Sequence, residues 1–477
     1  MLHPADARMD TSLPAPRPFS AIPRAPAVPL LGSLPALLRG HFDFLERSRA
    51  RCGDLFRLDL GATELVVVAD PGAAEEVLVQ RSKNFDKGDE FWSGAREAIG
   101  EGLALSEGEL WRRQRRLMNP AFRSERIAGF QATVEATIDE KLGSLAHLAA
   151  SGESFDVSAW TSDLLSTLTT RLLLGAALRP SEFAEFCDAQ RVLMDGVFLG
   201  VVTRRLPRWL PIPGADRFER ARRRIDALIL RLIAARRAAP GSGEDLLGML
   251  LAATDETGVM SDRQLRDEVV ITYIAGFETT AWALAWGLNV LADHPALLAE
   301  LQGERASPAL LDGTVREILR LYPSVPLLPR RAAVDETLLG HHIPAGTTVV
   351  VLPWLIHRNP KFWADPSRFD PRRHEDASVR ERPRLAWMPF GAGQRLCIGQ
   401  GLAMLEAKLT LAKILRRFTP TPAVDRRPSR PHLSGTLSSR EQQPCVPSWQ
   451  SGAGGLWLRT RPSREPFAAS DWHVKVG

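Results

Sequence analysis

A run of about 30 residues that begins at Ser261 constrains the fold of this chain more than any other feature. Ser261 and Gln264 form the capping-box pattern that starts a helix, and helix-forming residues follow until Asp293-His294-Pro295. At about 1.5 Å per residue, such a helix is roughly 45 Å long. The sequence therefore predicts one helix that crosses the whole molecule.

Helical patterns dominate most of the chain up to about residue 300, and short strand patterns accompany them. Clear helical runs lie at Ala215–Arg237 and at Gly399–Phe418. Strand patterns lie at Leu55–Leu60, at Glu64–Val68 and near Thr347–Leu352. We therefore expect a mainly α fold with a small β-sheet region.

Composition predicts how the chain is divided. Residues 1–25 are rich in Pro and Ala and show no apolar periodicity, which predicts a disordered N-terminus. Residues 26–460 carry the helical and strand patterns and are expected to form a single domain. Residues 461–477 are expected to be a C-terminal tail.

Charge and cysteine usage exclude several classes of protein. The net charge is only +5 over 477 residues, and no Lys/Arg block resembles a nucleic-acid-binding arm. The N-terminus lacks the apolar core of a signal peptide or membrane anchor, and no stretch approaches about 18 uninterrupted apolar residues. The four cysteines lie far apart and show no C-x-x-C spacing. We therefore expect a cytoplasmic protein without a membrane anchor that binds no nucleic acid.

The segment Pro389–Gly399 carries the strongest chemical signal. Three glycines surround Cys397, so the backbone can fold closely about the sulfur and point N–H groups at it. A helix that starts just after Cys397 adds its positive end, which stabilises a thiolate. Arg395 could pair with a carboxylate on a cofactor. The alternative is a structural cysteine in a glycine-rich turn, but the combination favours a metal ligand.

This segment resembles the haem-binding signature of the cytochrome P-450 family, F-x-x-G-x-R-x-C-x-G. The resemblance extends from about Pro26 to Phe418 and implies the cytochrome P-450 fold and a haem b cofactor. It implies that Cys397 is the ligand of the haem iron. It also implies contacts with the cofactor from Phe390, Gly391 and Arg395, while Gly393 and Gly399 match the signature as well.

A second motif, Ala275–Thr280, lies within the predicted long helix. A glycine inside a helix, here Gly276, suggests close approach by a ligand or a local distortion. An acid beside a hydroxyl suits proton delivery to bound oxygen. The resemblance assigns oxygen activation to Glu278 and Thr279, and places Gly276 at the cofactor. The alternative reading is a solvent-facing Glu278 with Thr279 bonded back to its own helix.

Arginines supply further predicted contacts to the haem propionates. Trp111 and Arg115 match the family's W-x-x-x-R motif and share one helix face. Arg330 aligns with another propionate-binding arginine. The neighbouring Arg112, Arg113 and Arg116 either form a basic patch for an acidic electron donor or are simply a solvated helix face.

The pair Glu317 and Arg320 matches the family's E-x-x-R motif. Their spacing puts both on one helix face, which by itself indicates only a surface ion pair. The resemblance implies a buried cluster with a second arginine, for which Arg373 fits best, while His374 replaces the family's usual Phe. This cluster is expected to support the haem pocket.

The resemblance implies a haem-thiolate monooxygenase that hydroxylates or epoxidises a lipophilic molecule such as a terpenoid, steroid-like compound, fatty acyl chain or polyketide. Dioxygen is the co-substrate. Electrons would come from a separate ferredoxin or flavodoxin with its NAD(P)H reductase, since no flavin- or cluster-binding segment accompanies the haem signature. A haem-thiolate isomerase or peroxygenase and a haem-based sensor are the alternatives. The predicted pocket segments are Phe91-Trp92, Val197–Leu199, Ile274, Ala275, Phe277, Val325, Leu327 and Leu328.

Overall fold

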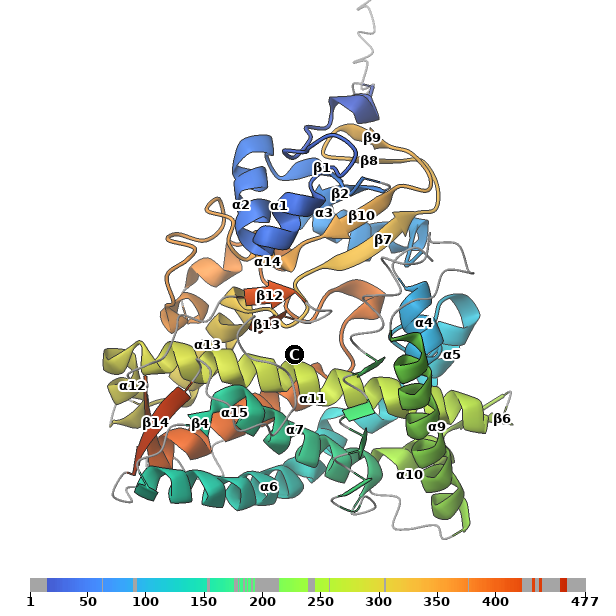
Figure 1. Ribbon diagram of the computed structural model, residues 1–477. Helices are drawn as coiled ribbons and strands as arrows, with labels where there is room; N and C mark the ends of the chain where they lie inside the picture. Colours follow the sequence, from blue (N-terminus) through green and yellow to red (C-terminus); the bar gives the residue numbers. More distant parts are fainter. Residues whose placement is uncertain are drawn as a thin grey trace, which may run out of the picture.

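The computed structural model places the chain in two lobes, one built on a sheet and one built of helices (Figure 1). It describes residues 15–460, apart from 62, 89–91, 152–154, 176–178, 180, 183–184, 187, 190–191, 194–213, 239–244, 257, 304–305, 376, 423–430, 434–436 and 440–454. Residues 1–14 and the predicted tail 461–477 lie outside the described part.

The sheet lobe is built from segments far apart in the chain. Its five strands run in the order β1-β2-β10-β7-β3. β10 and β2 are parallel, with Thr348 opposite Leu65, and the other neighbours are antiparallel. The bounds are β1 Leu55–Asp59, β2 Glu64–Val68, β3 Phe85–Asp86, β7 Leu328–Ala332 and β10 Thr348–Val351.

Both faces of this sheet are buried, which explains the continuous apolar run in β2. Leu65 and Val67 pack with Phe42 and Phe44 of α2 (His41–Cys52). Val66 and Val68 belong to the apolar cluster on the opposite face. A strand buried on both faces reads as uninterrupted hydrophobic sequence rather than as alternating residues.

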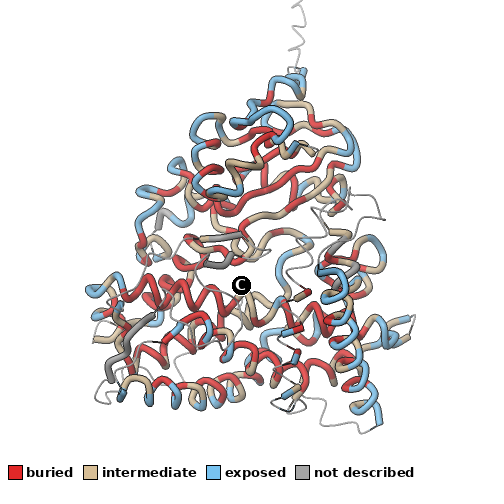
Figure 2. The backbone as a smooth tube through the Cα atoms, viewed as in Figure 1, coloured by how far each residue is buried: buried red, intermediate tan, exposed pale blue. Residues whose placement is uncertain are grey.

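The helical lobe is organised around α11, Asp262–Ala292. The predicted capping box is present: the Ser261 side chain accepts from the backbone of Gln264, and the Gln264 side chain accepts from the backbone of Ser261. α11 packs against α7 (Val157–Leu174), α9 (Ala215–Ala238) and α15 (Gln400–Arg417). In Figure 2 the buried residues follow α11 along most of its length. Within the described residues it is the one helix long and apolar enough to span a membrane, and 72% of its most apolar window is buried.

The remaining elements surround these two centres. The helices are α1 Leu34–Arg39, α3 Pro71–Glu75, α4 Ser93–Ile99, α5 Gly108–Met118, α6 Ser124–Ser151, α10 Leu246–Ala252, α12 Pro295–Gln302, α13 Pro308–Leu321 and α14 Pro353–Ile356. The strands are β4 Phe155–Asp156, β5 Thr254–Asp255, β6 Gly258–Val259, β8 Glu336–Leu338, β9 His341–Ile343, β11 Phe418–Pro422, β12 Pro431–Leu433, β13 Leu437–Ser439 and β14 Gly455–Thr460.

The predicted mainly α fold with a small sheet region is confirmed, and the predicted strands and helices lie within one or two residues of their expected bounds. The expectation of disorder is wrong for residues 15–25. Phe19–Ala21 form a 3-10 helix, and Ile22 and Ala25 are buried. Arg24 and Arg57 form an isolated parallel bridge beside β1. Prolines prevent a regular helix here, but they do not prevent an extended segment from lying along a sheet edge.

Candidate functional site

Cys397 lies between a 3-10 turn, Gly393–Arg395, and the start of α15. The Cys397 amide donates to the Phe390 carbonyl at 3.0 Å, which closes the loop. The amides of Gly399 and Gln400 donate to the sulfur, as the glycine-rich sequence predicted. Burial raises the pKa of the Cys397 thiol, although these two amides and the positive charge of Arg115 act to lower it. A bound metal cation would supply the charge that a thiolate needs here.

Gly393 is the most constrained residue of this loop. Its φ is +68°, and a Cβ added there would lie 2.1 Å from the Leu78 carbonyl oxygen. That oxygen belongs to the backbone, so it cannot move aside as a flexible side chain would. Only glycine therefore fits at this position.

Gly393→Ala is expected to destabilise the fold by about 1–2 kcal/mol through its positive φ, and by a further 1–3 kcal/mol through the clash. Gly340→Ala is the matched control, because φ there is +75° and nothing lies within 4 Å of an added Cβ. Urea unfolding of both variants measures the difference. Equal losses in the free energy of unfolding would show that the clash with the Leu78 carbonyl does not affect stability.

The acid–threonine pair lies in the middle of α11. The Thr279 hydroxyl donates to the Ala275 carbonyl at 2.8 Å, which is the back-bonded arrangement. Glu278 is half-buried, whereas Ala275 is exposed although it lies within a largely buried helix. Cys397 is likewise exposed although it lies deep in the molecule. Residues with accessible surface at such depth fit a site that receives an internal ligand.

Gly276 lies close to a neighbouring helix, α7, in addition to the predicted contact with a ligand. A Cβ added there would lie 3.3 Å from Cγ2 of Thr169 on α7. The glycine therefore lets α7 and α11 pack closely, which is an adequate reason for its presence in the helix. Its contact with the cofactor stays a prediction.

Glu406 was not predicted from the sequence, and it contacts Thr280, the residue that follows the acid–threonine pair. Glu406 is on α15, is 3% exposed, and bonds to the side chain of Thr280. Burial raises its pKa to about 8, against the hydrogen bond from Thr280, so the side chain is mostly uncharged at neutral pH. No local spacing links residues 280 and 406; the contact exists only because α11 and α15 pack together.

Three half-buried cations, Lys87, Arg330 and Arg395, lie close enough together to affect one another's pKa. Arg330 and Arg395 each have a pKa lowered to about 10, first by burial. The pKa of Lys87 is lowered well below its ordinary value by burial and by the charges of Arg395 and Arg330. Among the residues that the structure describes, one carboxylate, Glu107, acts on all three. An excess of buried positive charge fits a ligand that carries two carboxylates, as haem does.

Lys87 was not predicted, because a single lysine outside any motif gives no signal in a sequence. Arg395 and Arg330 were predicted. Arg395 donates to the Ser106 carbonyl at 2.7 Å, and its guanidinium lies 4.4 Å from the centre of the Trp111 ring. The Arg330 guanidinium donates to the Pro329 carbonyl at 2.8 Å, beside its own backbone.

Trp111 and Arg115 share α5, as predicted. Arg115 donates to the Leu396 carbonyl at 3.0 Å, next to the cysteine, so it secures the cysteine loop in addition to any contact with a propionate. Arg113 does not belong to an outward basic patch. Its guanidinium is bonded to Asp255 at 3.1 Å and to the Gly258 carbonyl at 3.0 Å. Arg112 and Arg116 are exposed.

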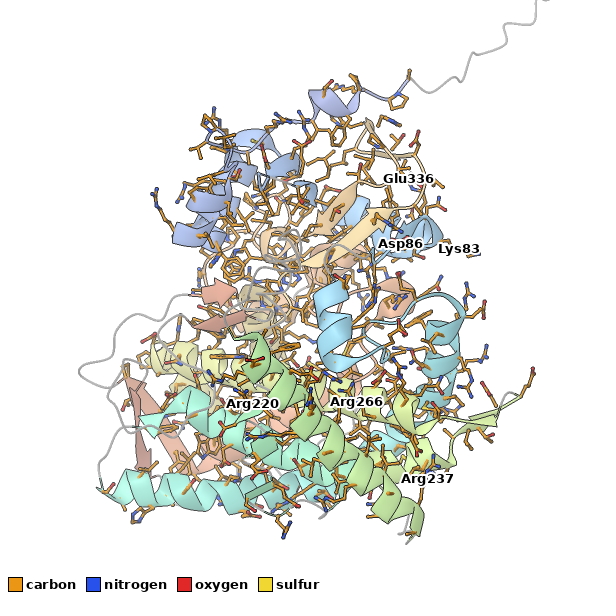
Figure 3. The ribbon with its side chains drawn as sticks, turned by 45° about the vertical axis from the view of Figure 1, so that its right-hand side comes forward. Lys83, Asp86, Arg220, Arg237, Arg266 and Glu336 are labelled. Atoms are coloured by element: carbon orange, nitrogen blue, oxygen red, sulfur yellow. The ribbon has the colours of Figure 1, made fainter. Side chains whose placement is uncertain are left out.

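α11 also fixes the loop that leads into α5. Arg266 of α11 (Figure 3) bonds to Asp226 of α9 and, at 2.8 Å, to its neighbour Asp267. Asp267 accepts from the amide of Glu101 at 2.9 Å. Glu268, which is fully buried, accepts from the amide of Leu103 at 3.0 Å. The acidic pair on α11 thus holds the backbone just before the helix that carries Trp111.

The E-x-x-R pair forms a fully buried cluster. Arg320 donates twice to Glu317, at 2.7 and 2.8 Å, and its remaining N–H groups reach the carbonyls of His357, Pro366 and Arg368. Arg373 lies 3.4 Å from Glu317, as the resemblance implied. His374 also contacts Glu317, at 3.0 Å. The replacement of the family's usual Phe therefore adds a polar partner to the cluster.

The predicted pocket residues are placed only in part. Ile274 and Phe277 are buried on α11, while Val325, Leu327 and Leu328 are half-buried after α13. Trp92 is half-buried, with Lys87 Nζ 5.2 Å from its ring centre. Phe91 and the range 197–199 lie outside the described residues.

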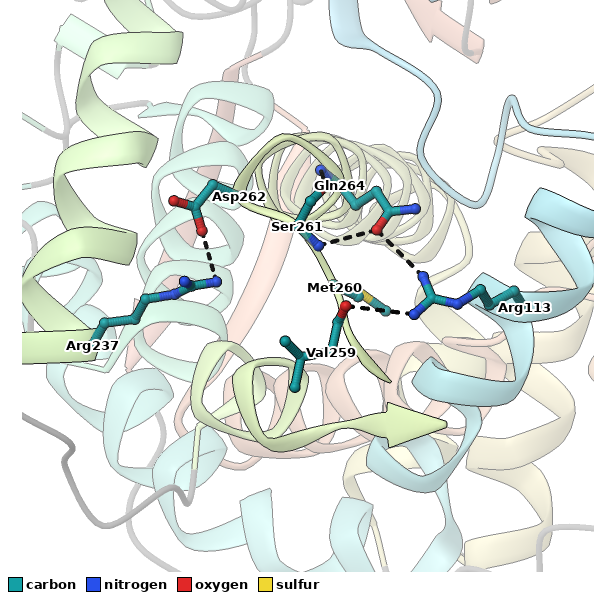
Figure 4. Close-up of a pocket in the computed structure, with 7 residues that line it drawn as sticks. All are labelled: Arg113, Arg237, Val259, Met260, Ser261, Asp262 and Gln264. Atoms are coloured by element: carbon teal, nitrogen blue, oxygen red, sulfur yellow. Dashed lines mark hydrogen bonds and ion pairs between the residues drawn. The ribbon is translucent and has the colours of Figure 1, made fainter. Parts of the chain in front are cut away.

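A separate surface pocket of about 660 Å³ lies at the start of α11 (Figure 4). Arg113, Arg237 and Asp262 line it, and they are engaged in ion pairs or hydrogen bonds. Ser261 at its rim is 18 residues before Thr279, about five helical turns away. This pocket is polar and belongs to the helix start rather than to the cysteine site.

Comparison with known proteins assigns this chain to one family. The family profile described as Cytochrome P450 matches residues 23–446. Cyclooctat-9-en-7-ol 5-monooxygenase of Streptomyces melanosporofaciens is 33% identical over 86% of this chain and 92% of its own length. Pentalenene oxygenase of Streptomyces avermitilis is 31% identical over 84% of this chain and 92% of its own length. A crystal structure described as the cytochrome P450DA heme domain superposes with a TM-score of 0.81, at 27% identity, covering 94% and 99% of the two chains. The chain belongs to the cytochrome P450 family.

Proposed function

We propose that this P450 monooxygenase oxidises a terpenoid or a similarly lipophilic molecule by hydroxylation or epoxidation. Two relatives act, by their names, on cyclooctat-9-en-7-ol and on pentalenene. The predicted pocket residues on α11 and after α13, such as Ile274, Phe277 and Leu327, are apolar. An apolar pocket favours a substrate without a charged anchor group.

The observation that carries the proposal is the sulfur of Cys397, which accepts two backbone N–H groups at the start of a helix. This geometry suits the single protein ligand of a haem iron. Lys87, Arg330, Arg395, Trp111 and Arg115 would hold the propionates. Phe390, Gly391 and Gly276 would contact the ring.

When bound, haem supplies the activation of dioxygen. The protein's own contribution is the position of a proton donor. Thr279 Oγ1 would turn from the Ala275 carbonyl and donate into the site. The Glu278 carboxyl would then resupply the proton to Thr279 Oγ1. A haem-thiolate isomerase or a haem-based sensor would need neither side chain.

For electron supply we propose a separate ferredoxin or flavodoxin with its NAD(P)H reductase, in the cytoplasm. The exposed Arg112 and Arg116 on α5 would contribute to docking of an acidic donor. The contribution of each is expected to be small, since each lies near a carboxylate, Glu109 and Asp255 respectively.

The first test is the absorption spectrum of the dithionite-reduced protein under carbon monoxide, which should show the strongly red-shifted Soret band of thiolate-ligated haem. Pentalenene and cyclooctat-9-en-7-ol are then added as probes, and a spin-state shift of the oxidised protein reports binding. NAD(P)H consumption with added ferredoxin and reductase, together with product analysis, separates a monooxygenase from a sensor. A Soret band typical of histidine-ligated haem would refute the proposal.

Replacing Lys87 with Met is expected to speed haem loss by about ten- to a hundredfold, because a charge-assisted hydrogen bond contributes about 1.5–3 kcal/mol. The apoprotein should become no less stable, since the variant removes a buried cation that neighbouring arginines repel. Haem transfer to a scavenging apoprotein and thermal melting of the apoprotein measure the two effects. Lys83→Met is the control, because Lys83 is exposed at the edge of the molecule (Figure 3). Unchanged haem loss would place Lys87 away from the propionates.

A further inference from the structure

A turn between α13 and β7 contacts α11 at the acid–threonine pair. The hydroxyl of Ser324 in this turn donates to the backbone carbonyl of Thr279 at 2.7 Å. Ser324 is 7% exposed, so water competes little for this bond. A hydroxyl that bonds to a carbonyl inside a helix draws on the same oxygen as the helical N–H group, and such contacts bend helices locally.

The same turn contacts α11 a second time. Tyr322 stacks on Trp286 of α11, with ring centres 4.5 Å apart and an angle of 4° between the rings. Thr279 and Trp286 are seven residues apart, so they lie on one side of the helix, two turns from each other. The stacked rings are an apolar contact, while the Ser324 bond is directional and fixes the carbonyl at one point.

This turn continues directly into residues assigned to the pocket and the cofactor. Val325 and Leu327 follow Ser324, and Arg330 lies on β7, which begins at Leu328. From another element, Glu406 of α15 bonds to the side chain of Thr280. Two other elements therefore bond to the Thr279-Thr280 segment: α15 bonds to the side chain of Thr280, and the turn at Ser324 bonds to the backbone carbonyl of Thr279.

We propose that Ser324 is a positioning residue that sets the placement of Thr279 relative to the pocket wall. The inference rests on the proposed function for its catalytic consequence, but the contact itself does not. Without the hydroxyl, the Thr279 carbonyl would be bound by the helix alone, and the restraint that the turn places on this part of α11 would be lost. The Thr279 hydroxyl would then be displaced from the place where its proton is needed, and a displacement of this kind lowers the rate steeply.

The expected chemical consequence is a change in how electrons are used. Each NAD(P)H supplies two electrons to one dioxygen. With well-placed protons, one oxygen atom enters the substrate and the other leaves as water. When protonation is misplaced, the same two electrons, with two protons, convert dioxygen to hydrogen peroxide. Ser324→Ala should therefore shift the balance from oxidised product to peroxide.

The test compares Ser324→Ala, Ser324→Thr and Ser48→Ala with the wild-type holoenzyme. Ser48→Ala is the matched control, because the buried Ser48 hydroxyl donates to the Phe44 carbonyl of α2 at 2.8 Å. Amide hydrogen exchange in α11 around Thr279 should become about fivefold faster in Ser324→Ala, the factor expected for a hydrogen bond that contributes about 1 kcal/mol. Ser48→Ala should change exchange in α2 only, and Ser324→Thr, which keeps the hydroxyl, should resemble the wild type.

With pentalenene or cyclooctat-9-en-7-ol as probe, the peroxide formed per NAD(P)H should rise about three- to tenfold in Ser324→Ala, a small part of what a positioned proton donor contributes. kcat should fall while KM stays constant. Ser324→Thr should restore the wild-type kcat and the wild-type peroxide fraction. The proposal would be overturned if amide exchange in α11 of Ser324→Ala matched that of the wild type. It would also be overturned if exchange became faster but the peroxide fraction stayed unchanged, because Ser324 would then have a purely structural role. If the wild type consumed no NAD(P)H with any probe, the proposed function would fail, and the exchange measurement would still decide whether Ser324 restrains Thr279.

Discussion

Replacing Cys397 with Ser is expected to abolish the red-shifted Soret band of the reduced carbon monoxide complex and to reduce oxidation of any substrate by at least about three orders of magnitude. The loop of Cys397 presents the Gly399 and Gln400 amides to a large, polarisable sulfur. A serine oxygen is smaller, holds its proton far more tightly, and donates less electron density to iron. The variant should therefore bind haem weakly or through another ligand.

The matched control is Cys52→Ser. Cys52 is half-buried at the end of α2, and its thiol contacts the Arg24 carbonyl at 3.3 Å, so it tests loss of a thiol away from the site. That variant should keep the red-shifted band at full intensity. A Cys397→Ser protein that retained the band would show that a different residue binds the iron.

Replacing Glu317 with Ala is expected to destabilise the protein by about 3–5 kcal/mol, because it leaves a fully buried guanidinium without its carboxylate. Arg320 and Glu317 have no exposed side-chain surface, and the amide of Asp370 also donates to Glu317 at 3.0 Å. Chemical denaturation of the apoprotein measures the loss. The surface pair of the exposed Arg372 and the half-buried Glu300 is the comparison, and Glu300→Ala should change the free energy of unfolding by less than about 1 kcal/mol. Equal losses at both sites would mean that burial does not set the energy.

Glu317 should also affect acid stability. Burial alone would raise its pKa, but hydrogen bonds from Arg320 and His374 lower it to about 2. A carboxyl whose folded pKa lies below its unfolded value, about 4.3, stabilises the fold above that value. This contribution is lost as the pH falls through the window between about 4.3 and 2. A Glu317→Gln variant should lose that part of the pH dependence, which unfolding curves at a series of pH values would detect.

The local features of the site could be predicted from sequence, because short-range spacing determines them. The capping box at Ser261 fixes the start of α11, the glycines around Cys397 permit its loop, and three-residue spacing places Glu317 beside Arg320. Each of these depends on neighbours within one or two helical turns. They were sufficient to predict the fold, which the structure confirms, and to propose Cys397 as the metal ligand.

The residues that were missed depend on contacts between distant segments. Lys87 joins Arg330 and Arg395 only after β7 and the cysteine loop have packed together. Ser324 bonds to Thr279 and Glu406 bonds to Thr280, each from a different element, and nothing adjacent in sequence marks them. The packing role of Gly276 escaped notice for a related reason, since its neighbour on α7, Thr169, is more than a hundred residues away. Arg113 resembled part of a surface patch until the strand pair β5–β6 supplied its partners.

The parallel pairing of β2 with β10 has a consequence for how the protein is made in a cell. The two strands are separated by about 280 residues of chain. A ribosome that adds about 5–20 residues per second needs roughly a quarter of a minute to a minute to reach the second strand. Throughout that time the edge of β2 that will pair with β10 has no native partner, although β1 can already pair with the other edge. The open edge can pair with another nascent chain. Expression at lower temperature and chaperones that shield strand edges should therefore raise the yield of correctly folded protein. The stability of the folded protein itself would not change.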